Sequence, residues 1–150
     1  IGFFEHMLTN IIALAAFIPV IIGMGGNIGT QSSTIIVRGI ATGRIELGNE
    51  LKILIKEIQV GVILGLLYGF LLGLFARYNF IEADPFLGIV VGLSICCSMI
   101  IAAAVGAFTP LILRKLNIDP AIATGPFVTT SVDILGVLLY FIIAGKFLNM

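Results

Sequence analysis

The chain has 150 residues, of which 59% are hydrophobic and only 11% are charged. Soluble domains carry about 25% charged residues, so this composition excludes an ordinary soluble globule and predicts an integral membrane protein. The formal net charge is zero, which leaves no basic field for binding nucleic acid. The expected fold class is all-α: a polytopic bundle of transmembrane helices.

Four segments are apolar enough to span a bilayer, which needs about 20 residues per helix. We expect them at about residues 8–40, 58–76, 85–113 and 121–144. The first reaches this length only if its polar stretch lies at membrane depth, where protein or water must satisfy the backbone. The chain has no signal-peptide pattern, and we expect it to be a fragment of a longer protein.

Lys and Arg residues concentrate on the cytoplasmic side of a membrane protein. Six of them fall in or beside two connections, whereas only Arg77 and Lys146 fall on the other side. We therefore expect residues 44–56 and 114–117 to face the cytoplasm, with both ends of the chain outside. Because Trp is absent, the expected anchors at the membrane interface are the phenylalanines and the three tyrosines, Tyr68, Tyr78 and Tyr140.

The first cytoplasmic connection, residues 44–57, has apolar residues at helical spacing: Leu47, Leu51, Leu54, Ile55 and Ile58. Charged residues occupy most of its other positions. This pattern predicts an amphipathic helix that lies at the membrane interface and anchors the bundle.

Small residues predict how the spans pack. Four glycines repeat every four residues on one face of the second span, where another backbone can approach closely: Gly61, Gly65, Gly69 and Gly73. Gly88 and Gly92 give the third span a weaker version of this face. Cys96 and Cys97 are adjacent within an apolar run, which favours packing over a disulfide or a metal site.

A polar stripe follows one face of the first span, if that span is helical: Asn27, Thr30, Gln31, Thr34 and Arg38. Nearby glycines leave backbone carbonyls reachable by water or by a partner: Gly23, Gly25, Gly26 and Gly29. The stripe alone fits two interpretations equally, hydrogen bonding between helices and the lining of an ion path.

Asp133 is the carboxylate in the middle of the last span. A carboxylate at mid-membrane costs about 2.5–3.5 kcal/mol on insertion scales, and such groups usually mark an ion or proton route. Small and hydroxyl-bearing residues share or continue its helix face: Gly125, Thr129, Gly136 and Tyr140. Together the two stripes favour an ion path over the alternative, in which Asp133 is protonated or pairs with Arg38.

The expected ligands are hard oxygens only, which argues against zinc and copper. One carboxylate per chain is too sparse for a dehydrated calcium cage, and it suits a cation gripped through its own waters, such as Mg²⁺. A twofold dimer would bring two Asp133 side chains to its axis. An inside-negative potential favours entry of a divalent ion by about 4.6 kcal/mol per ~100 mV. No catalytic or phosphate-binding pattern predicts an enzyme.

Asp119 and Pro120 precede the last span. An Asp at the N-cap with Pro at the first helical position explains both residues without a functional role. A cation site at the cytoplasmic mouth is the alternative for Asp119.

The sequence resembles the membrane domain of the MgtE family of magnesium channels and transporters. Three ordered stretches carry the resemblance: IPVIIGMGGNIGTQSST (18–34), KEIQVGVILG (56–65), and DPA through GPFVTTSVD (119–133). The resemblance implies a membrane domain of five helices, of which this chain holds the second to fifth. It also implies a homodimer with a pore between the subunits, lined by the first and last spans here.

For single residues, the resemblance implies that Asp133 holds a hydrated Mg²⁺ in the pore and that Asp119 takes part in Mg²⁺ sensing with a cytosolic part. The expected pore lining consists of small and polar residues: Gly23, Gly26, Asn27, Thr30, Gln31, Thr34, Gly125, Thr129 and Thr130.

The predicted function is therefore transport of Mg²⁺, with other divalent cations as further candidates, through a dimeric pore in the plasma membrane. The expected partners are a second copy, the lipid bilayer and regulatory domains upstream. Two other functions stay open: a proton- or Na⁺-coupled carrier, and a structural subunit whose polar stripes only hold helices together.

Overall fold

A computed structural model describes residues 2–45, 48–80, 83–123 and 125–148, with the side chains of residues 2–11 and 123 outside the description. These residues form four long helices and one short 3₁₀ helix. In chain order they are α1 (Gly2–Ala41), α2 (Glu50–Asn79), α3 (Leu87–Lys115), η1 (Pro120–Ala123) and α4 (Pro126–Phe147). The described residues contain no strand.

All four long helices can cross a bilayer by length and composition. Their spans have mean hydropathies of 1.9, 2.2, 2.5 and 2.1 in chain order. The predicted all-α, polytopic membrane fold is therefore confirmed.

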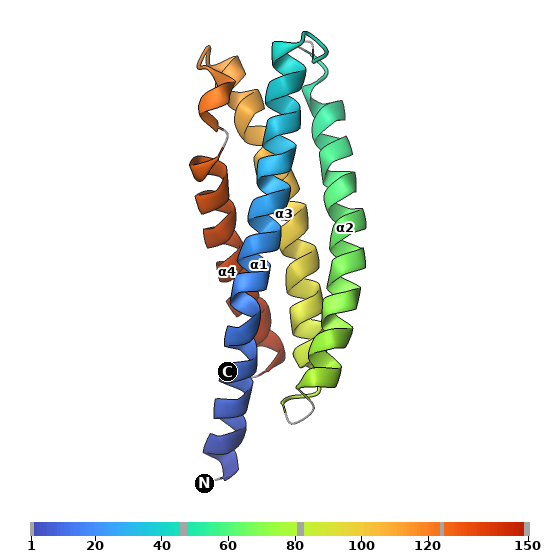
Figure 1. Ribbon diagram of the computed structural model, residues 1–150, viewed down its shortest axis with the longest axis vertical. Helices are drawn as coiled ribbons and strands as arrows, with labels where there is room; N and C mark the ends of the chain where they lie inside the picture. The colour runs from blue at the N-terminus through green and yellow to red at the C-terminus, as the bar shows by residue number, and fades with distance from the viewer. Residues whose placement is uncertain (1, 46–47, 81–82, 124, 149–150) are drawn as a thin grey trace.

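The bundle is built around α3, which packs against each of the other three long helices. Figure 1 shows α2 and α4 on opposite sides of the central pair α1 and α3. The α1–α2 and α3–α4 connections lie at one end of the bundle, as the distribution of Lys and Arg predicts. Arg114, in the last turn of α3, joins this helix to the α1–α2 connection, because its Nη1 donates a hydrogen bond to the carbonyl oxygen of Ile45 at 2.6 Å.

The glycine face of α2 packs on α3 as predicted. A Cβ built on Gly69 would lie 2.5 Å from the carbonyl oxygen of Gly92, and one built on Gly73 would lie 2.8 Å from that of Gly88. Any side chain at these positions would force the two backbones apart, so the close approach requires glycine. Cys96 packs in the same contact, with its Sγ 3.3 Å from the Cβ position of Gly65.

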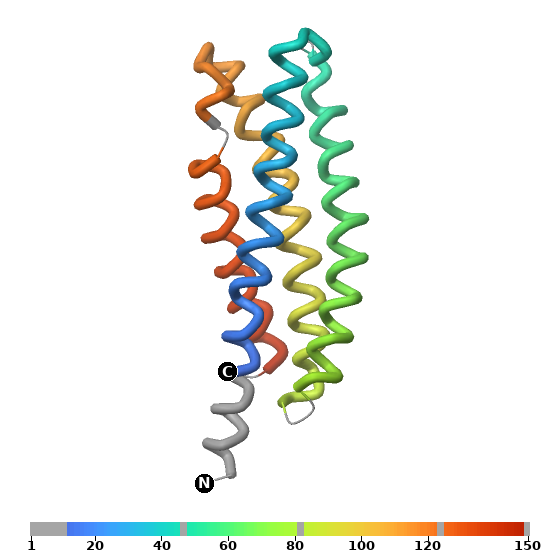
Figure 2. The backbone as a smooth tube through the Cα atoms, in the orientation of Figure 1, coloured from blue at the N-terminus to red at the C-terminus, as the bar shows by residue number. Residues whose placement is uncertain are grey.

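The predicted amphipathic helix at residues 44–57 is wrong. Figure 2 shows α2 as one continuous helix from Glu50, and its first two turns contain four of the charged residues of that segment: Glu50, Lys52, Lys56 and Glu57. Ile53 and Leu54 pack against a small core cluster that contains Ile36 and Ala107, and this packing directs the helix into the bundle. Leu47 lies outside the described residues.

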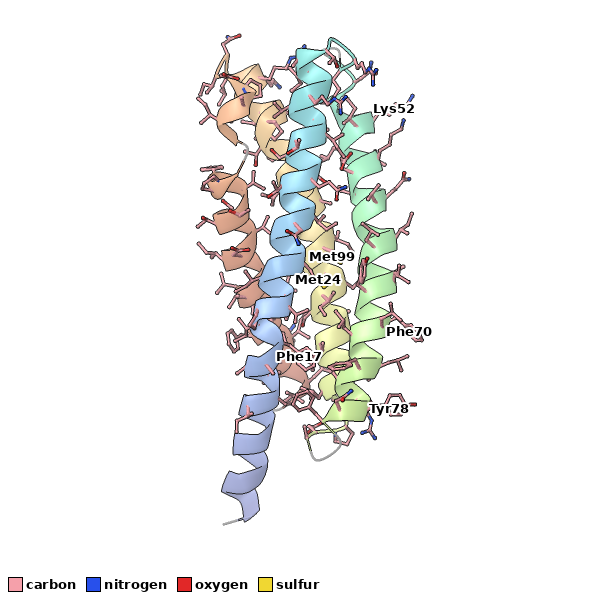
Figure 3. The ribbon with its side chains drawn as sticks, viewed as in Figure 1. Phe17, Met24, Lys52, Phe70, Tyr78 and Met99 are labelled. Carbon is pink, nitrogen blue, oxygen red and sulfur yellow. The ribbon has the colours of Figure 1, made fainter. Side chains whose placement is uncertain are left out.

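Tyr140 is not an interface anchor. Its side chain is fully buried, and its hydroxyl donates a hydrogen bond to the carbonyl oxygen of Leu14 at 2.9 Å. A buried phenol is stable when its hydroxyl finds such an acceptor. Tyr68 and Tyr78, by contrast, are exposed on α2, and Figure 3 shows Tyr78 projecting outward near its end.

The last span begins later than the sequence predicts. Residues 120–123 form the separate helix η1, and the backbone turns at Gly125 before α4 starts at Pro126. Gly125 has φ +84° and ψ −129°, a conformation that residues with a side chain rarely adopt. Pro126 at the first helical position then fixes the start of α4.

Candidate functional site

A groove of about 460 Å³ runs between α1 and α4. Met24, labelled on α1 in Figure 3, marks its level in the bundle. Its lining includes Asp133 and most of the predicted pore-lining residues: Gly23, Gly26, Asn27, Thr30, Gln31 and Thr129. Ile22 also lines the groove, although the sequence does not predict it. The polar stripe of the first span and the carboxylate of the last thus share one surface.

Small residues on the other side of α1 bring α1 and α4 together. Cβ atoms built on Gly25 and Gly29 would lie 3.1 and 3.0 Å from the side chain of Val132. These two glycines therefore pack inside the bundle, whereas Gly23 and Gly26 line the groove. The glycine run thus divides between two faces of α1, as helical spacing requires.

Asp133 lies about two turns into α4 and is half-buried. Its Oδ1 atom is buried and has no hydrogen-bond partner among the described residues. Gly26 faces it, since a Cβ built there would lie 3.4 Å from Oδ1. A buried carboxylate oxygen without a partner is unfavourable in isolation, so the site favours a cation or water as its partner.

Arg38 does not pair with Asp133. It is exposed in the last turn of α1, and about 18 Å of helix separates it from Gly26, which faces the carboxylate. The alternative in which Arg38 neutralises Asp133 is therefore wrong within the chain.

Two threonine hydroxyls, in the groove lining and beside it, donate to backbone carbonyls near their own positions in the chain. Thr129 Oγ1 lies 3.3 Å from the carbonyl oxygen of Gly125 and 3.2 Å from that of Pro126. Thr34 Oγ1 donates to the carbonyl oxygen of Thr30 at 2.8 Å. A hydroxyl whose proton is used in this way keeps its lone pairs, so it can accept hydrogen bonds from water.

Three predicted pore-lining residues lie beyond the groove lining. Thr34 and Thr130 are exposed, each on a helix that lines the groove. Gly125 caps α4, and its carbonyl oxygen accepts a hydrogen bond from the Thr129 N–H at 3.1 Å. Its conformation, rather than a contact in the groove, accounts for glycine at this position.

Asp119 is exposed at the connection between α3 and α4. Its Oδ1 accepts a hydrogen bond from the backbone N–H of Ala121 at 2.9 Å. This bond caps η1, which agrees with the predicted capping role, although the capped helix is η1 and not the last span. Asp119 lies outside the groove that contains Asp133.

The fold and groove define a class of protein: an integral, multi-pass α-helical membrane protein with an oxygen-lined groove between two of its spans. Comparison with known sequences identifies the family, because residues 18–143 match the MgtE family, described as divalent cation transporters. The chain belongs to this family. It is thus a transporter-family protein and not an enzyme, as the sequence predicts.

The chain is similar to three bacterial proteins, each named magnesium transporter MgtE. It is 40% identical to that of Thermus thermophilus over 141 residues, 36% to that of Bacillus subtilis over 149, and 34% to that of Enterococcus faecalis over 146. The matches cover 94%, 99% and 97% of this chain but 31%, 33% and 32% of the relatives, respectively. The chain therefore spans about a third of their length. These bacterial relatives and the four spans indicate the plasma membrane as its location.

Proposed function

We propose that the chain forms the membrane part of a Mg²⁺ transporter in which Asp133 holds a hydrated ion between two copies. The observation that carries this proposal is Asp133, which lines a polar groove and whose buried Oδ1 has no hydrogen-bond partner among the described residues. Membership in a divalent cation transporter family and the names of the three relatives support the choice of cargo.

The ligand set suits an ion that keeps its water. Among the described residues, no three His, Cys, Asp or Glu side chains gather to form a metal site. Mg²⁺ loses its six waters reluctantly. At about 30 Å³ per water, six waters occupy roughly 180 Å³, which the groove of about 460 Å³ can accommodate. Asp133 then provides the charge, and Asn27, Thr30 and Thr129 provide neutral oxygens for the ion's waters.

A dimer supplies what one chain lacks. The groove carries one carboxylate, and a twofold axis along it would place a second Asp133 across the ion. Near Asp133, the side of α4 that faces away from the core consists of exposed residues: Phe127, Thr130 and Ile134. The membrane potential would then drive a divalent ion inward with about 4.6 kcal/mol per ~100 mV.

Asp119 supports a secondary proposal, a regulatory Mg²⁺ site at the cytoplasmic mouth of this pore. Its carboxylate is exposed, and the cap of η1 involves Oδ1. The other oxygen is then a candidate ligand for a cation shared with cytosolic domains upstream.

The structural-subunit alternative is less favoured. Within the described part of the chain, Asn27 and Gln31 make no hydrogen bond to another helix, and both side chains are exposed. Instead, α1 and α4 pack through glycine and valine. The polar stripe is therefore not needed to join these two helices.

Flux measurements in liposomes test the proposal. Asp133→Asn in the full-length protein should abolish Mg²⁺ flux while the amount of dimer stays unchanged, because the amide keeps the shape and loses the charge. Asp84→Asn is the matched control, since Asp84 lies outside the groove, in the connection between α2 and α3, where its Oδ1 accepts a hydrogen bond from the Phe86 N–H at 2.8 Å. Wild-type flux in Asp133→Asn would reject the proposal, and flux that follows a pH gradient instead of voltage would favour a carrier.

A further inference from the structure

A second carboxylate lies at a contact between α1 and α2, away from the groove. Ser32 Oγ donates a hydrogen bond to Glu57 Oε2 at 2.7 Å, an ordinary length for a hydroxyl donor and an oxygen acceptor. Ser32 is only 3% exposed, and Glu57 is half-buried. The bond joins helices whose residues are 25 positions apart in sequence, so it fixes one helix against the other.

Ser32 lies on the far side of α1 from the groove. At 100° per residue, it points about 170° away from the centre of the face formed by Gly26, Asn27 and Thr30. It follows Gln31 directly in the chain, and it is about 9 Å along the helix from Gly26. Glu57 therefore contacts α1 on the face opposite the groove, close to the level of the polar groove residues along the helix.

The helix that carries Glu57 is a rigid support. Its glycine face packs backbone to backbone against α3, with Cβ positions on Gly61 and Gly65 falling 3.0 and 2.8 Å from carbonyl oxygens of α3. Such a contact leaves α2 little room to rotate or slide. The position of Glu57 relative to α3 is thus well defined.

Rotation of α1 would displace the groove residues. A helix with its side chains has a radius of about 5–6 Å, so a turn of roughly 20° moves a surface oxygen by about 2 Å. The apolar neighbours of Ser32, Ile28 and Ile36, are buried but have no directional preference of this kind. The hydrogen bond to Glu57 does have a directional preference, so it adds a restraint on the rotation of α1 to the close contact between Gly29 and Gly106.

We propose that Glu57, acting through Ser32, is a positioning residue for the groove. It fixes the rotation of α1 so that Asn27 and Thr30 meet the waters of the bound cation. This inference rests on the proposed transport function. Because selectivity depends on the arrangement of the oxygens that surround an ion, loss of the bond should change the preference among divalent cations.

The test compares Mg²⁺ and Ca²⁺ flux through the full-length protein in liposomes. Ser32→Ala and Glu57→Ala should each lower the ratio of Mg²⁺ to Ca²⁺ flux by about fivefold, and the double variant should lower it no further. Glu57→Gln should stay within about twofold of wild type, because its amide oxygen still accepts the bond. Glu50→Ala is the matched control on the same helix and should keep the wild-type ratio.

A ratio that stays at the wild-type value in both alanine variants would overturn the inference and leave the bond as a structural contact. Additive losses in the double variant would also overturn it, as would a loss in Glu57→Gln equal to that in Glu57→Ala. If the alanine variants fail to fold, Ser32→Cys keeps the size and weakens the donor, and its ratio must fall. Asp133→Asn in the same assay separates the two proposals. Normal flux in Asp133→Asn rejects the transport site. Blocked flux in Asp133→Asn, together with wild-type ratios in the Ser32 and Glu57 variants, rejects only the role of Glu57.

Discussion

Gly26 and Asp133 face each other where α1 meets α4. A Cβ on Gly26 would come into van der Waals contact with Asp133 Oδ1, at 3.4 Å. The same oxygen is buried and lacks a hydrogen-bond partner among the described residues. Glycine at position 26 therefore leaves room beside the carboxylate of Asp133, next to the groove.

Gly26→Ala should reduce Mg²⁺ flux about fivefold to tenfold, or roughly 1–1.4 kcal/mol. The methyl fits without a clash but contacts Asp133 Oδ1, so it places an apolar group against the carboxylate. Gly23→Ala adds the same methyl about one turn away, with nothing within 4 Å, and should lose less flux. Initial rates in liposomes measure both. Equal losses in the two variants would show that groove width matters and contact with Asp133 does not.

Gly106→Ala should destabilise the bundle by about 1–3 kcal/mol. Its Cβ would overlap the carbonyl oxygen of Gly29, so α1 and α3 would have to separate. Thermal unfolding in detergent measures the effect, and Gly23→Ala, which has open space, is the control. An unchanged unfolding temperature in Gly106→Ala would mean that the two helices do not pack this closely.

Tyr140→Phe should lower the free energy of unfolding by about 1 kcal/mol, the usual net value of a hydrogen bond. The variant loses the bond to the Leu14 carbonyl and keeps the buried ring. Tyr78→Phe is the matched control, because Tyr78 is 70% exposed. Flux should be unchanged in both variants. Equal stability of the two variants would contradict a structural role for the Tyr140 hydroxyl.

Asp119→Asn separates the two roles of that residue. Asparagine caps a helix about as well as aspartate, so the stability of the protein should be unchanged. If Asp119 binds a regulatory ion, the loss of charge should weaken the response of flux to Mg²⁺ on the cytoplasmic side by about tenfold. Titration of that side with full-length protein measures the response. A wild-type response would leave Asp119 as a cap only.

Hydrophobic length predicted all four spans, and the four-residue repeat of glycines predicted the face of α2 that meets α3. Both signals can be read from single helices. They hold in the fold because lipid offers no hydrogen-bond partners, so a membrane-spanning backbone must satisfy its own groups within helices. The groove was also predictable in outline, since the stripe on α1 and the acid on α4 are each visible as a helical face. That these faces adjoin depends on Gly25, Gly29 and Val132, whose contacts no single-helix pattern reveals.

The errors have physical causes of the same kind. Apolar spacing in residues 50–57 fits an interface helix and the start of a span equally well, and packing of Ile53 and Leu54 decides between them. A tyrosine near a span end suits the interface, yet the Leu14 carbonyl holds Tyr140 in the core. The hydrogen bond between Ser32 and Glu57 joins two helices, so helical periodicity gives no sign of it.

A high-resolution map of the full-length protein in Mg²⁺, compared with one recorded after chelation, tests directly whether Asp133 holds a hydrated ion. We expect a density between two Asp133 carboxylates, about 4 Å or more from their oxygens because water intervenes, and its loss on chelation. A density bonded directly at about 2.1 Å, or two Asp133 side chains that face lipid with no ion between them, would rule out a hydrated ion held by Asp133.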